Sequence, residues 1–175
     1  MSFLKAPSPS LKSMDADTET RDAYLKARKS IDETGAVTDY AGLDTAQYEA
    51  LLAEEEVLLS ITENGYGKRT NAYEYRVTNR GGQGIINIET SSRNGNVVAT
   101  FPITEDEQIM LVTNGGKLIR TPVVDIRIAG RNTQGVTLFK TAEGEQVVSV
   151  TSLAESKSED DAAEEADLAD EGGNG

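Results

Sequence analysis

Hydrophobic and polar positions follow two different patterns along the chain, and the change falls near residue 56. Before it, apolar residues recur at helical spacing, as Ala23, Tyr24 and Ala27 do. After it, short apolar runs and alternating stretches are separated by Gly and Asn, which is typical of strands joined by tight turns. The pattern therefore predicts a short helical segment followed by a mainly β region.

Two short helices are expected in the first part. Residues 18–29 are mostly helix formers with acids in the first turn, where negative charge favours a helix start. The range 35–42 breaks this pattern with glycines, and Asp44 is followed three residues later by Gln47. That spacing is typical of a capping box, so we expect a second helix from there to about residue 55.

The β region is expected to hold four strands between residues 57 and 101. An apolar run opens it, Asn64-Gly65 and Asn94-Gly95 are turn signals, and residues 73–78 alternate between apolar and polar side chains. The four expected strands are 57–62, 73–78, 84–88 and 97–101.

The same set of residues then recurs 51 positions later. Matching pairs include Thr62 with Thr113, Gly65 with Gly116, Arg69 with Arg120, Arg80 with Arg131, and Gly84 with Gly135. The strands expected in this second copy are 109–113, 124–128, 136–139 and 147–150. A repeat of about this length with four short strands is close to a β-propeller blade, so a stacked or circular array is expected rather than one compact core.

The amino-acid composition excludes several classes of catalytic and metal-binding function. The chain contains no Cys and no His, which excludes Ser-His and Cys-His catalysis and the usual zinc ligands. Residues 64–70 resemble a phosphate-binding loop only superficially, because Thr62 stands where that loop needs Gly and Arg69 stands where it needs Ser or Thr. The acidic run 105–107 has no accompanying ligand element, so we assign no metal site to it.

No apolar run of membrane-spanning length is present, and we expect a cytoplasmic chain whose partner is nucleic acid or protein.

Charge is distributed unevenly. Residues 1–56 hold 6 basic and 12 acidic side chains, residues 57–153 hold 10 and 9, and residues 154–175 hold 1 and 9. The formal net charge of −13 therefore comes mainly from the two ends, and the repeat region can still present basic patches to an anionic partner.

Six basic residues at or near the expected turns are the candidate anion contacts. They are Lys68, Arg69, Arg80, Lys117, Arg120 and Arg131. The glycines beside Arg80 would let backbone amides approach a phosphate. Each turn could equally be structural with solvated basic residues, but recurrence in both copies favours an anion-binding role. For Arg76 and Arg127, pairing with Glu74 or Asp125 is the favoured interpretation.

Residues 63–70, 80–85, 116–121 and 130–136, in this order and spacing, closely resemble the carboxy-terminal domain of bacterial DNA gyrase A. The resemblance covers about residues 56–153, and residues 22–56 are similar to a helical insertion found in some alphaproteobacterial members. It implies a six-bladed β-pinwheel whose basic rim wraps DNA and thereby lets an ATP-dependent type II topoisomerase introduce negative supercoils. Duplex DNA, the rest of gyrase A, and gyrase B are the implied partners, and the six basic residues are the implied phosphate contacts.

Several departures from the family pattern limit what the resemblance implies. Two blades cannot close a pinwheel, and the family's Gln-Arg-Arg-Gly-Gly-Lys-Gly box is missing. No tyrosine follows an arginine, so no covalent DNA intermediate is expected, and ATP and Mg would act through other domains of the parent enzyme. Residues 1–13 do not match, which suggests a truncated reading frame. Alternatives are the equivalent domain of topoisomerase IV, or a blade-repeat protein-interaction module without DNA binding.

The expected fold is therefore mainly β: two four-stranded blades of a propeller-like pinwheel, preceded by a short helical segment and followed by a disordered acidic tail. The expected divisions are a disordered lead-in (1–17), the helical segment (18–55), the two blades (56–104 and 105–153) and the tail (154–175).

Overall fold

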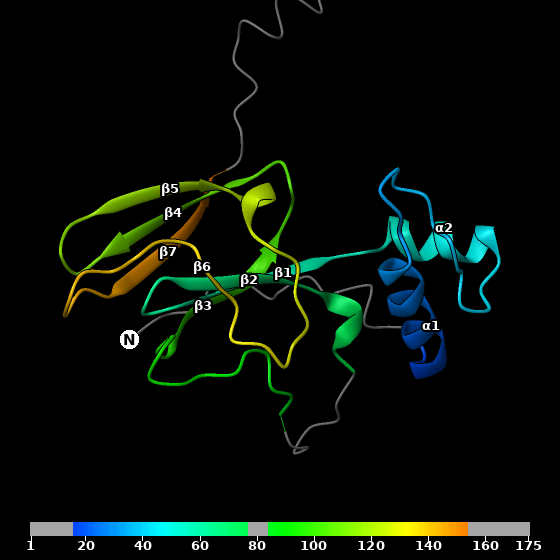
Figure 1. Cartoon of the computed structure of the whole chain (residues 1–175), viewed down its shortest axis with the longest axis horizontal. Coiled ribbons are helices and arrows are strands. Elements are labelled where there is room, and N and C mark those ends of the chain that lie inside the picture. The colour runs from blue at the N-terminus through cyan, green and yellow to red at the C-terminus, as the bar shows by residue number, and fades with distance from the viewer. Residues whose placement is uncertain (1–15, 77–83, 154–175) are drawn as a thin grey trace, which may run out of the picture.

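A computed structural model describes residues 16–76 and 84–153. The predicted disordered lead-in up to residue 15, the predicted disordered tail and the candidate Arg80 lie outside these residues. In Figure 1, two helices lie at one end of the molecule and the strands of the second copy lie at the other. The first copy lies between them.

Both predicted helices are confirmed. Helix α1 (Thr18–Lys29) begins after Asp17, whose side chain accepts the backbone N–H of Thr20. Helix α2 (Thr45–Ala53) begins after Asp44, which forms the predicted capping box with Gln47. In both helices the cap satisfies a backbone donor that has no partner within the helix.

The first sheet has the strand order β3-β1-β2-β6. Strands β1 (Val57–Thr62) and β2 (Tyr66–Asn71) form a hairpin, and β3 (Val97–Ile103) pairs antiparallel with the other edge of β1. Strand β6 (Val136–Thr137) belongs to the second copy in sequence, yet it pairs with β2 of the first. The two copies are therefore joined by a shared sheet.

The second sheet repeats this design with three strands in the order β5-β4-β7. Strand β4 (Gln108–Thr113) corresponds to β1, β5 (Leu118–Pro122) to β2, and β7 (Val147–Leu153) to β3. Even the irregularity of the ladder recurs, between residues 61 and 62 in one sheet and between 112 and 113 in the other. The sequence repeat is thus a repeat of structure, and the mainly β fold is confirmed.

The strands predicted at 73–78 and 124–128 are wrong where the structure describes them. Ala72–Glu74 and Val123–Asp125 are instead short 3-10 helices, η2 and η3. The alternation of apolar residues there reflects a tight turn that buries Ala72, Tyr73 and Tyr75. Residues 84–88 form no strand either. The second strand of each hairpin is instead β2 or β5, neither of which was predicted.

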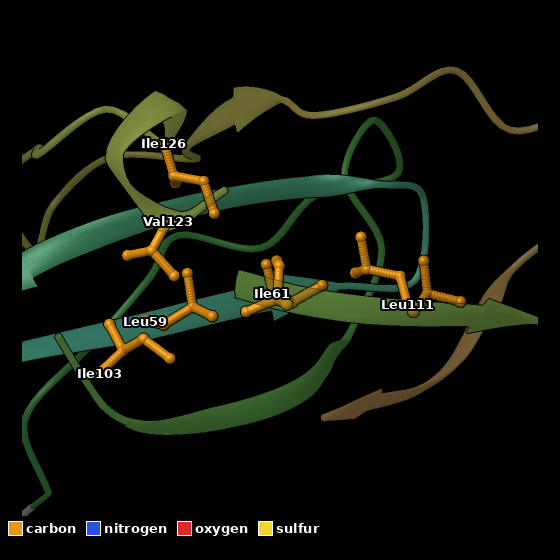
Figure 2. Packing of buried hydrophobic residues seen from close by; sticks show 8 residues of the cluster. Leu59, Ile61, Ile103, Leu111, Val123 and Ile126 are labelled. Carbon is orange, nitrogen blue, oxygen red and sulfur yellow. The ribbon is translucent and has the colours of Figure 1, made fainter. Parts of the chain in front are cut away.

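Two apolar clusters hold the molecule together. The larger one joins both sheets: Leu59, Ile61 and Ile103 of the first sheet pack with Leu111 of the second and with Ile126 after η3 (Figure 2). The smaller cluster joins the helices to η2 through Tyr24, Tyr48 and Tyr73, with the Tyr24 and Tyr73 ring centroids 4.7 Å apart. The helical segment is therefore packed onto the first copy.

Candidate nucleic-acid interface

Lys68 does not stand on an exposed turn, as the sequence suggested, but lies fully buried in β2. Its ammonium donates to the carbonyl oxygens of Gly130 and Arg131, at 2.6 and 2.7 Å, and also to Thr133. Burial lowers the pKa of Lys68 to about 8, since removal from water disfavours the charged form. Lys68 thus ties the first copy to the loop that precedes β6.

Arg69 has a similar place, and the prediction that it is exposed is also wrong. Its Nε donates to the carbonyl of Ile126 at 2.5 Å, and its Nη1 contacts Glu105 at 2.7 Å. The backbone of Arg69 also bonds to Arg127 and Ala129. The guanidinium donors of Arg69 are therefore engaged by acceptors of the second copy. Contact of Lys68 and Arg69 with DNA phosphates stays a prediction, and the burial of both side chains argues against it.

The remaining described candidates are more accessible. Lys117, after the β4–β5 turn, is more than half exposed and forms an ion pair of 2.7 Å with the buried Glu145. The Lys117 ammonium and the bonds from Ala142 and Thr113 lower the pKa of Glu145 to about 2. Arg120 is exposed on β5 and donates its Nε to Gln108.

Arg131 lines a groove of about 440 Å³ between α1 and the loop before β6. Its backbone N–H donates to Glu74 and its Nη1 to the carbonyl of Ile86. We call this space the α1 groove. Among the described residues that line it, four are basic (Arg21, Lys29, Arg76 and Arg131) and two are acidic (Asp22 and Glu74).

The charges of the α1 groove favour an anionic ligand. Basic side chains outnumber acidic ones two to one along its walls, and one of the two carboxylates, that of Glu74, already accepts the Arg131 backbone N–H. Arg76 and Lys29 are exposed, so their charges face solvent. In a molecule with a net charge of −13, such a local excess of positive charge is a place where a polyanion can approach.

A second basic group lies near the hairpin turns. A hollow of about 620 Å³ is lined by Arg93, Lys140 and Tyr66, among others. The Arg93 guanidinium lies 5.4 Å from the centroid of the Tyr66 ring and donates to the Tyr66 hydroxyl. Bonds from Thr137 and Arg93 lower the pKa of Tyr66. Glu145 is on the same wall, so the positive excess is smaller than in the α1 groove.

Sequence reasoning missed most of the α1 groove. Arg76 carried a signal, since it recurs as Arg127, but its favoured interpretation was pairing with an acidic neighbour. Arg21 and Lys29 carried none, because only the packing of α1 against η2 brings them beside Arg131. Arg93 was likewise unmarked, since it has no counterpart in the repeat.

Neither a metal centre nor a membrane span is found among the described residues. Residues 16–76 and 84–153 contain no group of three or more carboxylates that could hold a metal ion. None of the helices in this part of the chain is long and apolar enough to cross a bilayer.

Two joined β units of this design define a class of protein: a repeat array of propeller-type blades. The family model "DNA gyrase C-terminal domain, beta-propeller" matches residues 56–104 and 107–154. The chain belongs to the DNA gyrase A C-terminal domain family, and the pinwheel fold predicted from the resemblance is confirmed.

Individual relatives agree with this assignment. The DNA gyrase A protein of Rickettsia prowazekii is 41% identical over 174 residues, and that of Rickettsia bellii is 44% identical over 171. Each alignment covers 93% of this chain but only 18% and 19% of the relative. The chain thus spans about a fifth of the length of these relatives.

Solved structures show the same fold. A DNA gyrase A C-terminal domain matches with a TM-score of 0.53 at 30% identity, over 57% of this chain and 34% of that one. The C-terminal domain of a DNA topoisomerase IV also matches with a TM-score of 0.53, over 65% of this chain and 36% of that one. The latter is 24% identical, which supports a shared fold only.

Proposed function

We propose that this chain binds the phosphate backbone of duplex DNA, as a C-terminal portion of DNA gyrase A. The observation that carries the proposal is the α1 groove, where basic side chains outnumber acidic ones on a chain that is acidic overall. Phosphate contacts orient DNA without reading its sequence, so we expect little preference among duplexes.

The exposed cations of the groove are the proposed contacts. Arg76 and Lys29 are exposed, and Arg131 is half-buried with one Nη engaged by the Ile86 carbonyl. Lys117 and Arg120 remain proposed contacts on the opposite blade, where both side chains are exposed. A DNA path across both blades would support wrapping, which requires contacts on successive units.

Binding can be tested by fluorescence anisotropy with a labelled duplex over a salt series. Each phosphate contact releases counterions, so the logarithm of the association constant should fall with the logarithm of salt by about 0.9 per contact. Arg76→Ala and Lys29→Ala should each reduce the slope by about that amount, with a uniform loss of affinity across duplex sequences.

Lys26→Ala is the matched control, because Lys26 is an exposed lysine of α1 that does not line the groove. It should leave the slope unchanged. Equal losses for Lys26→Ala and Lys29→Ala would contradict a groove-centred contact. A salt-independent affinity for the unmodified chain would contradict DNA binding and favour the blade-repeat interaction module.

The role of the complete enzyme extends this proposal. As part of gyrase A, the chain would help an ATP-dependent type II topoisomerase to introduce negative supercoils, with the rest of gyrase A, and gyrase B, as partners. ATP and Mg would act through other domains, and the cytoplasm is the expected compartment. The family match and the relatives favour gyrase over topoisomerase IV, whose domain shares the fold.

A further inference from the structure

Another groove, of about 410 Å³, lies where the helical segment, the first copy and the second copy meet. Its walls come from the C-terminal parts of α1 and α2, the start of β1, the end of β3, the turn before β4 and the loop after η3. All of these segments are internal to the chain. We call this space the acidic groove.

Apolar side chains form the floor of the acidic groove. Among the described residues that line it, they are Leu52, Val57, Pro102, Ile103 and Ile128. Ile103 belongs to the larger apolar cluster and Val57 packs against that cluster (Figure 2), so the core fixes the floor. Leu52 and Ile128 are 41% and 44% exposed. A partner that covers them gains free energy by removing apolar surface from water.

Carboxylates surround this floor. The described lining residues include four acidic side chains and a single basic one, which are Glu55, Glu56, Glu105, Glu107 and Arg28. Glu55 is paired with Arg28, whose Nε and Nη2 each lie 2.9 Å from its carboxylate oxygens. The other three carboxylates give the groove a negative excess, which attracts cations.

Two of these carboxylates are held in place by their own contacts. Glu107 accepts the backbone N–H and the hydroxyl of Thr104, at 2.7 and 3.0 Å. Glu105 pairs with Arg69 at 2.7 Å, although the Glu105 side chain is 67% exposed. Even with Arg69 counted, acidic residues outnumber basic ones four to two. Because both carboxylates are fixed beforehand, a cation that pairs with them costs little further ordering.

This combination favours a ligand that is both cationic and apolar. The negative rim repels the phosphates of a nucleic acid. A metal ion does not fit, because residues 16–76 and 84–153 contain no group of three or more carboxylates that could hold one. A purely polar cation would leave the apolar floor uncovered. A peptide with Lys or Arg beside a bulky apolar side chain matches both the floor and the rim.

We propose that the acidic groove is a docking site for a basic and apolar peptide segment of a partner protein. A bulky apolar side chain of that segment lies against Leu52 and Ile128, and its flanking cations pair with Glu105 and Glu107. The acidic groove shares no lining residue with the α1 groove. The proposal therefore does not rest on DNA binding, and it is tested without DNA.

Fluorescence anisotropy with a labelled synthetic peptide tests this proposal on the full chain. The probe carries Lys-Leu-Phe-Lys at its centre, and the control peptide carries Lys-Gly-Ser-Lys there. Residues 154–175, with 9 acidic side chains and 1 basic one, attract any cationic peptide, so the apolar pair has to provide the discrimination. The probe should bind about tenfold more tightly than the control peptide, because only the probe buries apolar surface.

Variants of the groove locate the binding site. Leu52→Asn should weaken probe binding about fivefold, and Glu105→Gln about twofold to fivefold. Leu118→Asn and Glu49→Gln are the matched controls and should leave the affinity unchanged, since both residues are exposed and neither lines the groove. Far-UV circular dichroism checks that each variant is folded. If Leu52→Asn fails to fold, Ile128→Asn replaces it with the same expected loss.

Three results would overturn the proposal. One is equal affinity for the two peptides, a comparison that needs no variant. Another is a loss of equal size for Leu52→Asn and Leu118→Asn. The third is displacement of the labelled probe by spermine as readily as by the unlabelled peptide, which would identify a site for cations in general.

Discussion

At the scale of single residues, positions that are equivalent in the repeat have different environments. Arg69 and Arg120 match in sequence, yet Arg69 is buried between the copies and Arg120 faces solvent. Lys68 is buried among carbonyls, while its counterpart is the apolar Ile119. The difference arises because β2 of the first copy pairs with β6, whereas β5 of the second copy pairs with β4 alone among the described strands. A basic residue of a blade can therefore lie either in the junction between the copies or on the solvent-exposed surface.

Replacing Lys68 with Met tests its structural role. The variant should lose about 1–3 kcal/mol of unfolding free energy at pH 7, because the carbonyls of Gly130 and Arg131 lose a buried donor. Urea denaturation followed by circular dichroism measures the loss. A variant of unchanged stability that binds DNA more weakly would instead identify Lys68 as a phosphate contact.

The pH dependence of stability, compared between the unmodified chain and Lys68→Met, gives an independent check of this structural role. Lys68 has a pKa of about 8 in the folded chain, below its usual value near 10.4 in an unfolded one. Between these values the unfolded state binds more protons, so the stability of the unmodified chain should rise with pH relative to Lys68→Met. Below pH 8 the difference between the two proteins should be constant.

At the scale of elements, the junction depends on a close approach of two backbone segments. Gly135, just before β6, has φ +78, and a Cβ added there would lie 2.7 Å from the Gly67 carbonyl oxygen. Only glycine fits both the positive φ and the contact. The pairing of β6 with β2 thus depends on the absence of a side chain at Gly135.

Gly135→Ala should therefore separate β6 from β2 and lower the unfolding free energy by more than ~1 kcal/mol. Gly116→Ala is the matched control, since Gly116 has φ +80 but no atom within 4 Å of the added Cβ. Thermal unfolding should show a larger loss for Gly135→Ala than for Gly116→Ala. Equal losses would mean that backbone conformation matters and the close approach does not.

At the scale of the whole molecule, charge is separated along the chain. The range 57–153 is nearly neutral, whereas residues 154–175 hold 9 acidic side chains and 1 basic one. Such a segment is attracted to the same basic surface that a polyanion would use, and this attraction is strongest at low ionic strength. The acidic segment is therefore expected to weaken DNA binding by competition.

Deleting residues 154–175 should raise the affinity for duplex DNA at low salt, and the gain should shrink as salt rises. Fluorescence anisotropy at two salt concentrations measures both effects. A matched variant that keeps the length but replaces the acidic residues with Ser and Gln should show the same gain. Unchanged affinity at low salt would count against competition and leave solubility as the role of the segment.

Much of the fold could be read from the residue pattern. The capping box at Asp44 and Gln47, the first strand, and the repeat with its Gly turns depend on local interactions that the sequence states directly. The strand predicted at 73–78 was wrong because alternation over so few residues also suits a 3-10 turn. Strand β2 was missed since basic and polar residues fill it and its burial comes from neighbours distant in sequence, whereas β5 is a short strand that is mostly exposed.

The sequence alone thus settles the family, the blade repeat and the two helices, because motifs, caps and turns are properties of adjacent residues. The burial of Lys68, the exchange of β6 between copies and the gathering of Arg21, Lys29 and Arg76 around one groove arise only in the folded chain. These features join segments that are far apart in the sequence, such as Lys68 and Thr133, which are 65 positions apart. Whether a cation meets a carbonyl or solvent depends on which segment packs against it, and that is a property of tertiary packing.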